Sequence, residues 1–63
     1  MSLTLKQARR LIDKSQAEIA KLLNIHVQTY RKLEENPDKA TIAQAKKISK
    51  ILNISYDEIF FAN

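Results

Sequence analysis

The fold of this chain is decided by residues 15–34, which read Ser-Gln-Ala-Glu-Ile-Ala-Lys-Leu-Leu-Asn-Ile-His-Val-Gln-Thr-Tyr-Arg-Lys-Leu-Glu. The apolar residues recur at helical spacing, which predicts two short amphipathic helices joined by a tight turn at residues 23–25. In the second helix Val27, Tyr30 and Leu33 stand three residues apart. That spacing places them on one face, which we expect to be buried.

The other face of this second helix carries Gln28, Arg31 and Lys32. A helix that is held by a partner helix and exposes an amide and two cations suits the DNA major groove. Seven Lys and Arg stand against two acidic residues through Leu33, and four Lys against five acidic residues from Glu34 onward. This basic half fits a polyanionic partner, but charge alone favours equally a small soluble domain with a solvated basic surface.

Composition bounds the class of protein. The chain has 63 residues, a net charge of +4 and no cysteine. Its length predicts one domain over residues 1–63, and the absence of cysteine excludes disulfides. Its longest uncharged run is too short to cross a bilayer, and no hydrophobic signal region follows Met1. These features predict a soluble cytoplasmic protein with no membrane partner.

The chain contains no glycine, and four capping boxes are the local signals of where its helices begin. In each box a Ser or Thr is followed three residues later by Gln or Glu, and each box precedes an apolar periodic run. They begin at Thr4, Ser15, Thr41 and Ser55. The predicted fold is all-α and compact, with five helices over residues 5–12, 16–22, 27–35, 42–52 and 56 to 60 or 61.

Several local features follow from the same pattern. We expect Leu11 in the first helix and Ile42 in the fourth to point inward, and residues 35–40 to form a polar loop around Pro37. Asn24 is expected to end the second helix in the left-handed conformation, and Asn53 is expected to end the fourth. His26 is a poor candidate for an N-cap, and Tyr30 is expected to reach the surface with its hydroxyl group.

Enzymatic chemistry has little support in the sequence. There is one histidine, no cysteine, no glycine-rich phosphate loop and no Gly-x-Ser-x-Gly motif. The acidic cluster at the end of the third helix has no histidine partners for a metal ion. We therefore predict no catalytic residue, no metal site, no cofactor and no small-molecule ligand.

Several pieces of the sequence together resemble the phage Cro/repressor-like, or XRE-type, helix-turn-helix proteins. The resemblance covers residues 5–60, and the order and spacing of the pieces carry it. The matching pieces are Ala8-Arg9, Ser15-Gln-Ala-Glu-Ile-Ala20, Asn24-Ile25, Tyr30-Arg-Lys-Leu-Glu34 and Leu52-Asn-Ile-Ser-Tyr-Asp-Glu-Ile-Phe60. It implies a lambda-repressor-like DNA-binding domain, and the short length is similar to that of Cro-type regulators from phages or prophages.

The resemblance implies that the third helix reads DNA bases. Val27, Gln28 and Lys32 occupy the positions that touch base edges, and Arg31 could reach a base or a phosphate. Gln28 suits adenine and Lys32 suits guanine, while Val27 could pack on a thymine methyl group. Partial burial on the core side is an alternative for Val27.

Phosphate contacts and an ion pair are implied in the same way. Gln16, in the first turn of the second helix, is expected to bind a backbone phosphate, with a solvated glutamine as the alternative. Arg9 and Glu34 match the ion pair that links the first helix to the end of the third. The other candidate phosphate contacts are Ser15, His26, Asn36 and Lys39; a Ser or Thr usually stands in the family where this chain has His26.

The family also forms two-fold dimers near the last helix, which implies a homodimer on a double-stranded operator. Ile54, Tyr56 and Phe61 are the candidate interface residues, and loose packing at the chain end is the alternative. Two rival functions remain open. One is a protein-interaction module, such as an antitoxin or adaptor that retained the fold, and the other is a non-specific nucleic-acid binder.

Overall fold

The computed structural model describes residues 3–55 and 57–61, and its regular elements are all helical. They are α1 (Leu5–Leu11), α2 (Gln16–Leu23), α3 (Val27–Glu35), the 3-10 turn η1 (Pro37–Lys39), α4 (Ile42–Leu52) and the π-helical turn η2 (Asp57–Phe61). The predicted all-α fold of five helices is confirmed, with η2 as the fifth. The predicted loop at 35–40 instead contains η1, because proline is favourable at the first position of a helical turn.

Three helix starts carry the predicted capping boxes. At α1 the Gln7 N–H donates to Thr4 Oγ1 over 3.0 Å, and the Thr4 N–H donates to Gln7 Oε1 over 2.9 Å. The boxes of α2 and α4 have the same reciprocal bonds. Each cap contributes about 1 kcal/mol, which matters in a domain of this size. Before η2, the Glu58 N–H donates to the backbone carbonyl of Ser55 over 3.0 Å.

Asparagine ends two of the helices, as predicted. Asn24 and Asn53 are left-handed, with φ of 57° and 55°. A third left-handed residue, Asp13 with φ of 57°, lies between α1 and α2 and was not predicted. Asn and Asp tolerate this conformation better than other residues with a Cβ, so the chain makes its turns without glycine.

The core lies where α1, α2, α3 and α4 meet. Tyr30 is its largest fully buried side chain, and Ala20 is buried between neighbouring helices. The core cluster consists of Leu5, Ala8, Ile19, Ala20, Leu23, Tyr30, Leu33, Ile48 and Leu52. Partly buried side chains, including Val27, Ile54 and Ile59, pack against it.

Two residues that were expected inside are exposed. Leu11 is 71% exposed because, at about 100° per residue, it lies roughly 120° around α1 from Leu5. Arg9 takes the inward position beside Leu5 and Ala8, and it is buried. Ile42 is 69% exposed for the same reason, since it lies roughly 120° around α4 from Ile48.

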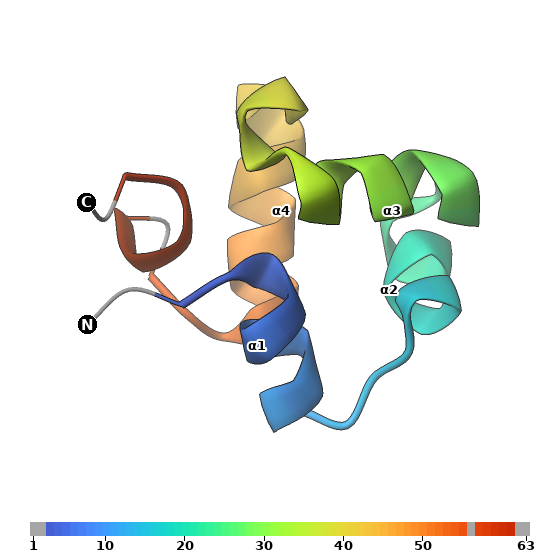
Figure 1. Cartoon of the computed structure of the whole chain (residues 1–63), viewed down its shortest axis with the longest axis horizontal. Coiled ribbons are helices and arrows are strands. Elements are labelled where there is room, and N and C mark those ends of the chain that lie inside the picture. The colour runs from blue at the N-terminus through green and yellow to red at the C-terminus, as the bar shows by residue number, and fades with distance from the viewer. Residues whose placement is uncertain (1–2, 56, 62–63) are drawn as a thin grey trace.

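The helix pair α2–α3 occupies one side of the molecule, and η2 lies on the opposite side beyond α1 and α4 (Figure 1). The α2 helix packs against both α3 and α4, and α3 continues into η1. On the far side the Leu3 N–H donates to the Glu58 carbonyl over 3.4 Å, which joins the two ends of the described chain. This arrangement leaves the outer face of α3 uncovered.

Candidate nucleic-acid interface

The outer face of α3 exposes polar and cationic side chains. Tyr30 is 0% exposed and Leu33 is 4% exposed, so these two residues anchor the inner face. Gln28, Arg31 and Lys32 are exposed. Val27 is half-buried and packs against the core cluster. This position agrees with the alternative given for Val27, partial burial on the core side.

The start of α3 is capped by His26. The Gln28 N–H donates to His26 Nδ1 over 3.1 Å, and His26 has extended backbone angles. The expectation of a poor cap was wrong, because an unprotonated imidazole nitrogen can accept the bond that a Ser or Thr oxygen usually accepts. The capping bond uses Nδ1 and requires the neutral ring, in which Nε2 carries the proton.

The end of α3 is tied to α1 by an ion pair. Arg9 Nε lies 2.6 Å from Glu34 Oε2, and Arg9 Nη2 donates to Glu34 Oε1 over 3.3 Å. The two side chains are only 10% and 5% exposed. Arg9 Nη1 also donates to the carbonyl of Lys14 over 2.8 Å. One guanidinium group therefore holds the α1–α2 connection and the end of α3 together.

The charge state of this pair follows from its hydrogen bonds. Burial disfavours the Glu34 carboxylate, but hydrogen bonds from Arg9 and Gln16 outweigh it and lower the pKa of Glu34 below its usual range. The hydrogen bond to Glu34 raises the pKa of Arg9. Both groups are consequently charged at neutral pH.

Tyr30 differs from its expected position. Its hydroxyl group is buried beside Arg9 and Glu34 rather than at the surface, and it makes no hydrogen bond within residues 3–55 and 57–61 that satisfies both distance and angle. Burial, together with the neighbouring Glu34 carboxylate, raises the pKa of Tyr30. Only the hydroxyl group was expected to reach solvent, but the whole ring and its hydroxyl group fit inside the core.

Gln16 connects the ion pair to the exposed face. Its Nε2 donates to Glu34 Oε1 over 2.9 Å, and its Oε1 accepts from Arg31 Nε over 3.4 Å. Arg31 Nη1 in turn lies 3.5 Å from Gln28 Oε1. A continuous chain of polar contacts thus runs from buried Arg9 to Gln28 on the outer face of α3.

A hollow of about 300 Å³ lies beside this chain of contacts. It is lined by Lys6, Gln16, Arg31, Glu34 and Glu35. Lys6 was not among the predicted site residues, because nothing in the sequence distinguishes it from other lysines on solvent-exposed helix faces. Only the packing of α1 beside α2 and α3 brings it there.

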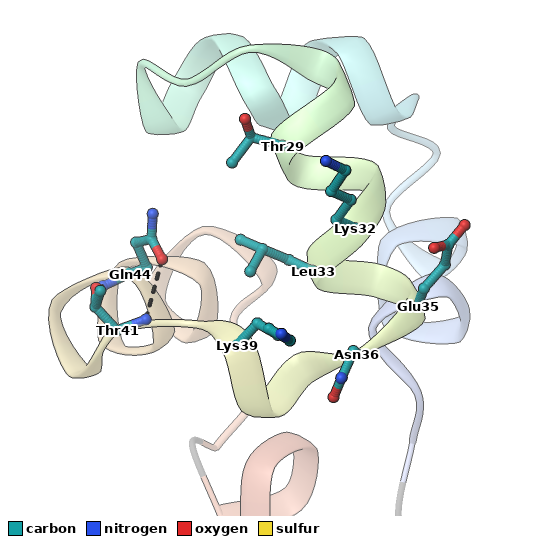
Figure 2. Close-up of a pocket in the computed structure, with 8 residues that line it drawn as sticks. All are labelled: Thr29, Lys32, Leu33, Glu35, Asn36, Lys39, Thr41 and Gln44. Carbon is teal, nitrogen blue, oxygen red and sulfur yellow. Dashed lines mark hydrogen bonds between the residues drawn. The ribbon is translucent and has the colours of Figure 1, made fainter.

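A larger hollow of about 640 Å³ lies between the end of α3, η1 and the start of α4 (Figure 2). It brings together three predicted site residues, Lys32, Asn36 and Lys39. Figure 2 shows Leu33 pointing toward the Thr41–Gln44 cap, and Glu35 directed away from it. The capping residues Thr41 and Gln44 also line this hollow; they were predicted as a helix start but not as part of a site.

The remaining predicted residues lie elsewhere. Ser15 caps α2, where its Oγ accepts the Glu18 N–H over 3.1 Å. Of the candidate dimer residues, Ile54 is half-buried and packs against the core cluster. Tyr56 and the side chain of Phe61 lie outside the described residues.

Two further properties concern the described chain, residues 3–55 and 57–61. None of its helices combines the length and apolar character needed to cross a membrane. Within the same residues, no three His, Cys, Asp or Glu side chains are grouped so that they could hold a metal ion.

Comparison with known protein families gives a match over most of the chain. The model of a family described as helix-turn-helix matches residues 5–59, which include α1 through α4 and most of η2. No curated protein and no solved structure matches the chain.

Proposed function

This chain belongs to the XRE/Cro-like helix-turn-helix family of DNA-binding proteins, and from that premise we propose that it is a sequence-specific transcriptional regulator. It would read operator DNA by placing α3 in the major groove. A phage or prophage origin, which the resemblance implies, belongs to the same proposal.

The observation that supports this proposal best is the outer face of α3. Gln28 and Lys32 are exposed there, while Tyr30 and Leu33 hold the helix from inside. An exposed glutamine can make two hydrogen bonds to adenine, and a lysine can donate to guanine O6 and N7. Val27, half-buried at the start of the helix, presents an apolar surface that suits a thymine methyl group.

The proposed backbone contacts flank this face. Ser15 and His26 are exposed at the starts of α2 and α3, and Asn36 and Lys39 are exposed beyond the end of α3. Phosphate contacts from both sides of a reading helix would fix its depth and register in the groove. A protein that uses several such contacts binds DNA less tightly as the salt concentration rises.

The proposal includes a homodimer on DNA. Two copies related by a two-fold axis would place their α3 helices in half-sites about 34 Å apart, on a pseudo-palindromic operator. Ile54, which packs against the core cluster, forms the proposed interface together with Tyr56 and Phe61. Occupying promoter DNA in this way would regulate transcription.

Selection of bound duplexes from a random pool tests the proposal. We expect one enriched sequence with two related half-sites, bound at least about a thousandfold more tightly than random DNA. Equal affinity for all duplexes would identify a non-specific nucleic-acid binder. Failure to bind any duplex would favour a protein-interaction module, and either result would overturn the proposal.

A further inference from the structure

The contacts of Gln16 limit what its side chain can do for DNA. Its Nε2 donates to Glu34 Oε1 over 2.9 Å. In the opposite orientation of the amide, Gln16 Oε1 would face Glu34 Oε1. Both oxygens only accept hydrogen bonds, so their contact would be electrostatically unfavourable. Because Glu34 keeps its charge through Arg9, the inward orientation of the Gln16 nitrogen is determined by the ion pair.

One N–H of Gln16 Nε2 is thus used by Glu34, and the atom that Gln16 turns to Arg31 is its oxygen, which accepts hydrogen bonds and cannot donate one to a phosphate. This Oε1 accepts from Arg31 Nε over 3.4 Å. Arg31 is exposed and has further N–H groups, and it lines the 300 Å³ hollow together with Lys6 from α1. A guanidinium group presents five N–H donors in a planar fork, which matches the geometry of a phosphate group.

Two carboxylates also line this hollow. Glu34 is neutralised by its ion pair with Arg9, and Glu35 is exposed to solvent. The two cations, Lys6 and Arg31, come from different helices that converge on the same hollow. The charge nearest the outward oxygen of Gln16 is that of Arg31, which is bonded to it.

We propose that Arg31 binds a phosphate of the DNA backbone at this hollow, and that Gln16 acts as a positioning residue for Arg31. This inference rests on the proposed DNA-binding function. It assigns the hydrogen bonds to phosphate near the start of α2 to the guanidinium group of Arg31 instead of the side-chain amide of Gln16. Lys6 adds a second positive charge at the same place. The Arg9–Glu34 pair then orients a phosphate contact as well as holding α3.

Salt-titrated binding to the selected operator tests the role of Arg31. Arg31→Ala should weaken binding at least about tenfold, because a charge-assisted hydrogen bond is lost. It should also reduce the slope of log K against log salt by about 0.9, the amount for one phosphate contact. Arg31→Lys should keep the slope and lose only part of the affinity, since it retains the charge without the fork.

A matched control is Lys47→Ala, which removes the same charge from the exposed face of α4 outside the hollow. It should leave the slope unchanged. The base preference of Arg31→Ala, measured by repeating the selection, should equal that of the wild type. Relaxed preference at one base pair, or a slope like that of the control, would overturn the assignment of Arg31 to phosphate.

A double-mutant cycle tests the role of Gln16. Gln16→Ala should weaken binding in the wild-type background but by less than about twofold in the Arg31→Ala background, because it acts through Arg31. Equal losses in both backgrounds would show that Gln16 contacts DNA itself and would overturn its role as a positioning residue. Should Gln16→Ala not fold, the slope and base preference of Arg31→Ala still decide whether Arg31 binds a phosphate. Absence of specific binding by the wild type would instead be the failure of the proposed function.

Discussion

The two ends of α3 are held in different ways. At its start one hydrogen bond, from the Gln28 N–H to His26 Nδ1, caps an exposed turn. At its end Glu34 accepts from Arg9 and Gln16, and the carboxylate is 5% exposed. The last turn is also covered from inside by Leu33.

This difference indicates where α3 is anchored. A buried carboxylate with several donors holds its position far more firmly than an exposed cap, because little solvent competes for its hydrogen bonds. We therefore expect the end of α3 to set the orientation of the helix. In the proposed complex, the start of α3 can adjust to the DNA at lower free-energy cost.

The largest expected effect comes from removing the anchor. Glu34→Ala leaves Arg9 partly buried without its partner and should destabilise the fold by about 3 kcal/mol. In a domain of this size the melting temperature should fall by more than about 10 °C. Glu35→Ala is the matched control, because that neighbouring carboxylate is exposed and should cost less than about 0.5 kcal/mol. An unchanged melting temperature in Glu34→Ala would contradict the anchoring role.

A smaller effect should appear with acid. Because the folded pKa of Glu34 is lowered from 4.5, its contribution to stability is complete above that pH and is lost as the pH falls through the folded pKa. Glu34→Gln removes this titration. The stability difference between wild type and Glu34→Gln, measured by urea unfolding, should therefore stay constant above about pH 5 and shrink as the pH falls below it. A difference that does not change with pH would show that the carboxylate does not titrate with a lowered pKa.

The smallest effect is expected at the start of α3. His26→Ala removes the capping acceptor and should cost about 1 kcal/mol or less, because the site is exposed. His26→Ser supplies a hydroxyl oxygen as acceptor and should restore the stability. The melting temperatures of the wild type, His26→Ala and His26→Ser test this expectation. A loss as large as that of Glu34→Ala would show that both ends of α3 are anchored equally.

Much of the fold was predictable because it depends on local patterns. The capping residues Thr4, Ser15 and Thr41 mark helix starts through bonds that span only three residues. Asn24 and Asn53 mark helix ends through their own backbone preference. Such features need no knowledge of distant parts of the chain.

The errors arose where the outcome depended on neighbours from other helices. How far around a helix burial extends depends on what packs against it: Leu11 and Ile42 were expected inside, but each lies roughly 120° around its helix from a buried residue and is mostly exposed. Tyr30 was expected to reach solvent, yet the surrounding helices enclose its hydroxyl group. His26 lacked the usual residue type for a cap, although its ring nitrogen has the required lone pair.

The candidate site shows the same division. The sequence by itself determined an all-helical chain in which α3 has an apolar inner face and exposes Gln28, Arg31 and Lys32, because helical periodicity and capping are local properties. Only the tertiary structure decided that the Gln16 amide turns its nitrogen to Glu34 and its oxygen to Arg31. It also decided that Lys6 faces the same hollow. These contacts join residues from α1, α2 and α3, and their geometry depends on how the helices pack.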